Sequence, residues 1–148
     1  MTAPSRTEQP TLHDVLGAPL PPAPAYGSNS IADVLESASS LVAQRSLARP
    51  AHALDSDPAF HAVADPLNLA GRLAEQDVDP VSFRHACVIM VDGLGEQLLN
   101  SYGGYAPALR KTLNLGPLDA AFPTTTAASL TSLGTGTAPG AHGIAGYE

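Results

Sequence analysis

The sequence predicts an α/β fold in which strands of a mostly parallel sheet alternate with helices. Residues 86–91 form a continuous apolar run that ends abruptly at Asp92-Gly93, as expected for a strand buried on both faces. A helix is expected from Glu96, a second short strand over 118–122 and another helix over 127–133. This alternation of strand and helix is typical of βαβ units.

Composition limits the number of domains and the classes of partner. The chain has 148 residues, enough for one domain. Its net charge is -7, from 14 acidic and 7 basic residues, which argues against a nucleic-acid or anionic-membrane surface. The single Cys87 permits no internal disulfide, and the first ten residues lack the apolar region of a secretory signal. We therefore expect a soluble, cytoplasmic protein.

The N-terminal half divides into an arm and the start of a domain. Residues 1–30 contain six prolines and are expected to form a mostly disordered arm, because proline fixes φ and removes a hydrogen-bond donor. Residues 31–148 are expected to form the domain. Ser30 is a candidate N-cap for a helix that ends before Arg49-Pro50. Further short helices are expected over 67–74 and 106–113.

Asp92 is the first candidate for a functional residue. It lies at the carboxyl end of the predicted strand 86–91, the edge at which open α/β sheets bind ligands. A carboxylate there can bind a divalent cation. Asp-Gly pairs are also common in ordinary turns, and Asp is a common helix N-cap. This segment alone leaves both interpretations open.

The second candidate is the run Thr124-Thr125-Thr126, between a predicted strand and a predicted helix. A hydroxyl at a helix N-terminus lies beside unpaired N–H groups, which favour a phosphate or a developing alkoxide. Threonine is a weak nucleophile, so a metal is the natural activator here. The alternative is an ordinary threonine N-cap.

The remaining candidates are weaker. Cys87 lies within the predicted strand and is expected to be an inert core thiol. Four histidines show no paired spacing for a metal: His13, His52, His61 and His85. His142 lies in a segment rich in glycine, and we expect it to orient that loop through hydrogen bonds.

Three segments together resemble a known family. They are residues 88–95 (VIMVDGLG), 122–126 (FPTTT) and 134–144 (GTGTAPGAHGI). They are similar to the N-terminal part of the type I phosphodiesterase/nucleotide pyrophosphatase family, of the alkaline phosphatase superfamily. In that family an apolar strand ends in Asp-Gly and is followed by Pro-Thr-x-Thr and His-Gly-Ile. Residues 26–37 (YGSNSIADVLES) resemble the opening segment of bacterial members.

The resemblance implies an alkaline-phosphatase-like α/β/α sandwich with two divalent metal ions, usually zinc. Asp92 would be a metal ligand, and Thr126 would be both a metal ligand and the nucleophile. Thr125 takes that role if the register slips by one. Ser129 occupies a position where many nucleotide pyrophosphatases have an Asn that contacts a phosphate oxygen. The implied substrate is a small phosphorylated molecule such as a nucleotide or a phosphodiester.

The length of the chain is a departure from the family pattern. The family's other ligands, several Asp and His, lie beyond the His-Gly-Ile segment, whereas this sequence ends at Glu148. A metal ion needs about three or four ligands, so the two-metal site would be incomplete. We expect a fragment of a metal-dependent phosphoester hydrolase that is inactive alone. The alternative is a truncated, non-catalytic α/β remnant that acts at most as a binding or interaction module.

Overall fold

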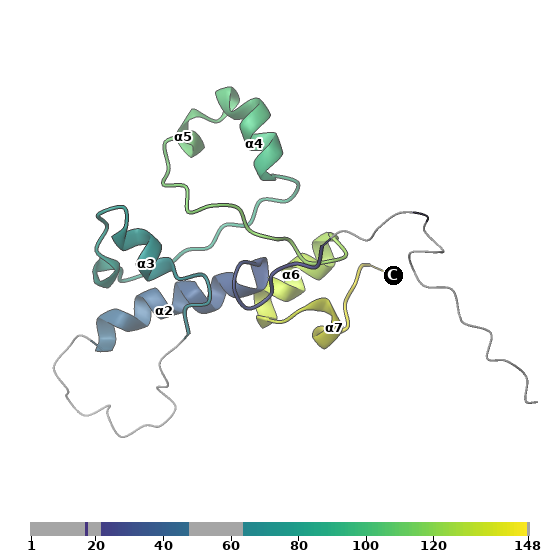
Figure 1. The fold of residues 1–148 in the computed structure, drawn as a ribbon, viewed down its shortest axis with the longest axis horizontal. Coiled ribbons are helices and arrows are strands. Elements are labelled where there is room, and N and C mark those ends of the chain that lie inside the picture. Colours follow the sequence, from purple (N-terminus) through teal and green to yellow (C-terminus); the bar gives the residue numbers. More distant parts are fainter. Residues whose placement is uncertain (1–16, 18–21, 48–63, 148) are drawn as a thin grey trace, which may run out of the picture.

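Helices make up most of the regular structure in the described part of the chain (Figure 1). The computed structural model describes residue 17 and residues 22–47 and 64–147, so most of the predicted N-terminal arm lies outside the described residues. The elements in chain order are η1 (Ile31–Asp33), α2 (Val34–Leu47), α3 (Leu69–Ala74), η2 (Pro80–Ser82), α4 (Glu96–Tyr102), η3 (Gly103–Tyr105), α5 (Pro107–Arg110), α6 (Thr126–Thr135) and α7 (Pro139–His142).

The helices begin close to where the sequence predicts them. The first helical segment starts directly after Ser30, and α4 starts at Glu96. The helix expected over 67–74 is α3, whose first amides, those of Leu69 and Ala70, donate to the Asp65 carboxylate at 2.9 Å. The helix expected over 106–113 is shorter, at Pro107–Arg110. The residues near these predicted boundaries therefore do begin helices in the structure.

The predicted α/β sandwich is wrong for the described residues, which contain no sheet. Residues 85–91 are extended but are not assigned to a strand, and Ile89 is 80% exposed. Only one isolated bridge is found in the described part of the chain, a parallel one between Ser30 and Asp119. A strand that is apolar on both faces needs neighbouring strands and covering helices. Cys87 is consequently exposed instead of buried in a core.

The second predicted strand, 118–122, is held by the N-terminal segment. The Asp119 amide donates to the Asn29 carbonyl at 3.0 Å, and the Ile31 amide donates to the Asp119 carbonyl at 2.9 Å. The backbone of Asp119 is thus paired with residues 29–31. This contact explains why an extended segment forms there without producing a sheet.

The core is small and lies between α6, η1 and α2, with α3 and η2 against α2. Its buried apolar residues are Ala32, Ala38, Leu41, Leu67, Leu73, Ala121, Ala127 and Ala128. Its buried polar residues are Ser30, Asp33, Ser37, Ser40, Ser129 and Ser132. Alanine and serine allow close helix approach but bury little apolar area, so packing alone contributes little free energy here.

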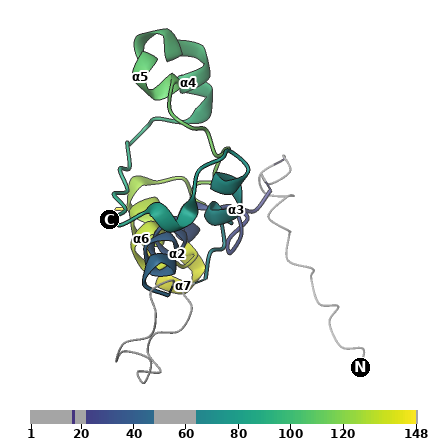
Figure 2. The same ribbon diagram turned by 90° about the vertical axis from the view of Figure 1, so that its left-hand side faces the viewer.

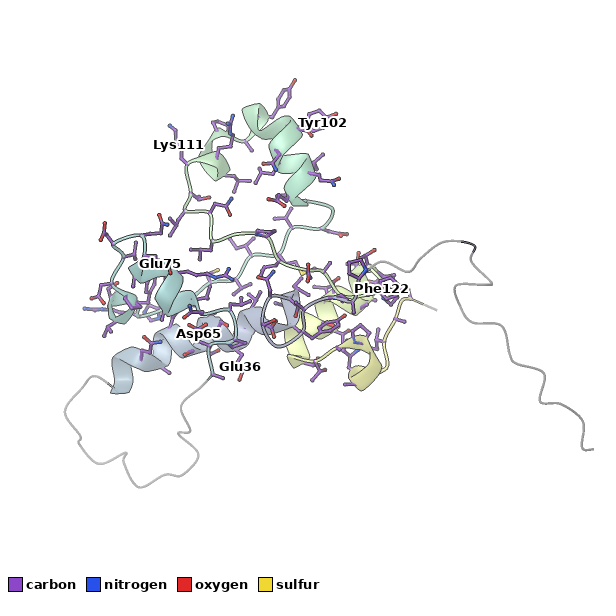
Figure 3. All side chains as sticks on the ribbon, viewed as in Figure 1. Glu36, Asp65, Glu75, Tyr102, Lys111 and Phe122 are labelled. Carbon is purple, nitrogen blue, oxygen red and sulfur yellow. The ribbon has the colours of Figure 1, made fainter. Side chains whose placement is uncertain are left out.

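Helices α4 and α5 form a lobe that projects from the rest of the described structure (Figures 1 and 2). Both contact η3, and neither makes substantial contact with any other described element. Tyr102 and Lys111 lie in this lobe, whereas Glu36 and Phe122 lie in the helical body (Figure 3). None of the described helices is long and apolar enough to span a membrane.

Candidate functional site

Asp92 and Thr126, 34 positions apart in the sequence, lie side by side. The Thr126 hydroxyl is 3.2 Å from Asp92 Oδ2 and 3.3 Å from Oδ1, so it donates to the carboxylate. Asp92 occupies a turn closed by the Leu94 amide and the Val91 carbonyl, 3.4 Å apart. Gly93 has φ of 71°, a value that suits glycine at the third position of a type II turn. The turn thereby aims the carboxylate at the start of α6.

Thr125 has a different environment from Thr126. Its hydroxyl donates to the Ala145 carbonyl at 2.7 Å and accepts from the Ala128 amide at 3.2 Å. It is therefore the N-cap of α6, the ordinary role that the sequence left open for this run of threonines. Because this hydroxyl donates its single proton to Ala145, it is less available than Thr126 for chemistry at Asp92.

The first turn of α6 leaves backbone donors near Thr126. The first amides of a helix have no partner within the helix. Thr125 satisfies the Ala128 amide, and in the described structure the Thr126 and Ala127 amides make no hydrogen bond. The positive end of the helix dipole and these amides favour an anion at this position.

Asp92, Thr126 and Ser129 line one pocket of about 630 Å³. Val88 and Val91 contribute to its apolar wall, as do Leu118 and Leu133. Ser129 is buried one helical turn after Thr126. The structure thus brings all three sequence-predicted site residues to one pocket, with an apolar wall and a polar end.

Sequence reasoning missed three residues: two hold the segment before α6, and the third holds the N-terminal turn that contains Gly27. The Asp119 carboxylate accepts from the Ala25 amide at 2.9 Å, and the Tyr26 hydroxyl accepts from the Phe122 amide at 3.0 Å. Asp33, which is 4% exposed, accepts from the Gly27 amide at 2.9 Å and from the Ser30 amide at 2.8 Å. The Ser-x-x-Asp spacing of residues 30–33 was the available signal, since an acidic N3 residue that reaches back to the N-cap is a known helix start.

Asp92 and Thr126 fit part of a metal site. Carboxylate and hydroxyl oxygens are suitable ligands for a hard divalent cation, and their oxygens lie close enough to share one ion. No cluster of three or more His, Cys, Asp or Glu residues that could hold a metal occurs in the described structure. The described residues therefore offer two oxygen ligands, fewer than the three or four protein ligands of a typical zinc site.

The imidazole of His142 contacts α6 but touches neither Asp92 nor Thr126. Its Nε2 lies 2.9 Å from Ser132 Oγ, and its Nδ1 accepts from the Ile144 amide at 3.1 Å. These bonds fit the expectation that His142 orients its own loop. His85, in contrast, is exposed on the extended segment.

These features define a class of site: a threonine hydroxyl at a helix N-terminus that donates to a carboxylate in a neighbouring turn, at the edge of a pocket. Residues 86–148, which are less than half of the chain, match the family model described as type I phosphodiesterase / nucleotide pyrophosphatase. The match contains Asp92, Thr126, Ser129 and His142 and leaves out residues 26–37. No curated protein and no solved structure gives a significant match to the chain.

Proposed function

We propose that this chain carries the nucleophile half of a metal-dependent phosphoester hydrolase of the phosphodiesterase/nucleotide pyrophosphatase type. The observation that carries the proposal is the contact between Thr126 and Asp92 at the start of α6. The family match over residues 86–148 supports it independently. The proposed substrate is a small phosphorylated molecule, such as a nucleotide or a phosphodiester, bound in the pocket with Ser129 near a phosphate oxygen.

Each residue has a defined task in this proposal. Thr126 loses its hydroxyl proton to solvent, and its oxygen forms a bond to phosphorus while the ester oxygen leaves with its electron pair. Attack by water on the resulting phosphothreonine restores the hydroxyl and releases the phosphate. The free amides of Thr126 and Ala127 orient the anionic group. A divalent cation such as zinc, held by Asp92 and Thr126, would favour the deprotonated hydroxyl.

The proposal is tested by trapping the phosphothreonine on the chain. The protein is incubated with Zn²⁺ and nitrophenyl phosphate, quenched in acid and analysed by mass spectrometry of its peptides. We expect phosphate on Thr126, formed at least about 100-fold more slowly in Asp92→Asn, the size of effect typical when one preorganised charge-stabilising group is removed. Asp77→Asn is the matched control, because this exposed carboxylate follows α3 and does not line the pocket that contains Asp92 and Thr126.

Phosphate on Thr125, or on neither threonine, would overturn this assignment. The second outcome would favour a non-catalytic binding module, the alternative suggested by the presence of only two oxygen ligands in the described structure. That alternative predicts that phosphate binds without covalent transfer. Equilibrium binding of inorganic phosphate, measured by calorimetry, then distinguishes a binding module from a chain without a phosphate site.

A further inference from the structure

We propose that His142 is a positioning residue for the threonine nucleophile: its imidazole ties the loop after α7 to α6, so that the Ala145 carbonyl holds Thr125 and leaves Thr126 facing Asp92. This inference rests on the proposed function and extends it to a residue that touches neither Asp92 nor Thr126. The contacts form one continuous path from Ser132, through His142 and the 143–145 backbone, to the cap of α6.

The hydrogen bonds fix which nitrogen of His142 carries the proton. A backbone amide can only donate, so the bond from the Ile144 amide requires a bare Nδ1. In a neutral imidazole the proton is then on Nε2, which donates to Ser132 Oγ at 2.9 Å. Ser132 is fully buried in α6, so this end of the imidazole is fixed to the most enclosed part of the helix.

The loop geometry transmits this anchoring to Thr125. Helix α7 ends at His142, and its C-cap Gly143, with φ of 79°, turns the chain back and brings the Ile144 amide to His142. The next residue, Ala145, accepts the Thr125 hydroxyl at 2.7 Å. Residues 142–145 therefore contact α6 at Ser132 and at its N-cap, and the segment between these contacts is only a few residues long.

The consequence concerns the choice between neighbouring hydroxyls. Thr125 gives its proton to Ala145 and accepts the Ala128 amide, whereas Thr126 donates to Asp92. If the loop moves, Thr125 loses its acceptor and the first turn of α6 loses part of its cap. Both effects would disturb the position of the Thr126 oxygen without changing any proposed ligand.

Two substitutions separate the two ends of the imidazole. His142→Asn places an amide oxygen where Nδ1 lies and so retains the acceptor for Ile144, while it loses the donor to Ser132. His142→Gln places its amide near Nε2 and lacks the Nδ1 acceptor. The Ser132 bond anchors the imidazole to α6 and the Ile144 bond anchors the loop to the imidazole, so losing either one should release the Ala145 carbonyl and both substitutions should be disruptive. His85→Asn is the control, since His85 lies on the exposed extended segment.

The first measurement needs no catalytic activity. Imidazole ¹⁵N spectra of the full chain should show a protonated Nε2 and an unprotonated Nδ1. Amide hydrogen exchange at Ala128 should become about fivefold faster in both His142→Gln and His142→Asn, as expected for a lost N-cap, and should change little in His85→Asn. Exchange at Leu99, whose amide bonds the Gly95 carbonyl in the projecting lobe, should stay constant in all variants.

The second measurement is the rate of phosphate transfer to Thr126 with Zn²⁺ and nitrophenyl phosphate. We expect about a fivefold reduction in both His142→Gln and His142→Asn, parallel to the loss of the cap, and near-normal transfer in His85→Asn. A proton on Nδ1, or unchanged Ala128 exchange in His142→Gln, would overturn the inference. The inference would also be overturned if the wild type transfers phosphate to Thr126 and His142→Gln transfers it at the same rate. Absence of phosphate on Thr126 in the wild type, with the exchange pattern as expected, would instead refute the proposed function and leave the structural connection intact.

Discussion

Asp33→Asn should destabilise the protein strongly, because Asp33 uses both carboxylate oxygens inside the structure. Oδ1 accepts from the Gly27 amide, and Oδ2 accepts from the amide and the hydroxyl of Ser30, all at 2.8–2.9 Å. An asparagine has one oxygen, so its NH₂ group must face an N–H donor on one side. The substitution therefore loses one or two hydrogen bonds and leaves a buried donor unsatisfied.

The expected loss of stability is about 2–4 kcal/mol, because a hydrogen bond to a charged group contributes about 1.5–3 kcal/mol. Domains have total stabilities of only about 5–15 kcal/mol, so this loss is large. It should be measured by urea unfolding, followed by circular dichroism. Glu36→Gln is the matched control: the same chemical change, three residues later, on an exposed side chain. Its effect should be within about 0.5 kcal/mol.

The refuting result is a loss in Asp33→Asn that equals the loss in Glu36→Gln. A variant that is unfolded in buffer agrees with the expected direction, since the loss then exceeds the stability of the wild type. Amide exchange gives a second test that does not depend on complete unfolding. Gly27 and Ser30 should exchange faster in Asp33→Asn, whereas Leu99 in the projecting lobe should not.

The remaining predictions concern turnover, coupling, the helix cap and self-association. The 148-residue chain should show no steady-state hydrolysis of nitrophenyl phosphate esters above background and should stop at the phosphothreonine after one transfer. Hydrolysis of the phosphothreonine would need a second metal ion, and the described residues contain no cluster of three or more His, Cys, Asp or Glu that could hold it; zinc-dependent turnover abolished by a chelator would contradict this. The effects of Asp92→Ala and Thr126→Ala on the rate of phosphate transfer should be strongly non-additive, so the double variant should be as slow as the slower single variant. A rate in the double variant that is reduced by the product of the two single effects would show that the two residues act independently. Thr125→Ala should cost about 1 kcal/mol of stability in a urea titration and slow phosphate transfer to Thr126 by only about fivefold, as expected for a lost N-cap. Loss of transfer comparable to Thr126→Ala would show the register to be wrong. Ile89→Lys should reduce concentration-dependent association in analytical ultracentrifugation, because Ile89 is 80% exposed on an unpaired extended segment. Leu98→Lys on α4 should have less effect. Equal association of the wild type and both variants would exclude this segment as the cause.

The local signals in the sequence predicted the helices, whereas the resemblance to the family implied that the candidate site residues lie together. Ser30 and Glu96 begin or precede helices as expected, and Asp92, Thr126 and Ser129 line one pocket. The helix starts depend on contacts within a few residues, whereas the contact between Asp92 and Thr126 joins residues 34 positions apart. The sheet could not be predicted in the same way, because it depends on which distant segments pair. The apolar pattern of residues 86–91 indicates a preference for burial, but it does not provide the partner strands.

The position of Thr126 depends on contacts from both sides of α6 and not on a sheet. On the N-terminal side, Tyr26 and Asp119 hold the segment before the helix, and Asp33 holds the turn that contains Gly27. On the C-terminal side, the Ala145 carbonyl holds the N-cap. Each contact joins segments that are separated in the sequence, so α6 is restrained at its start from two directions. The contact between Asp92 and Thr126 can therefore form although the segment that leads to Asp92 remains unpaired.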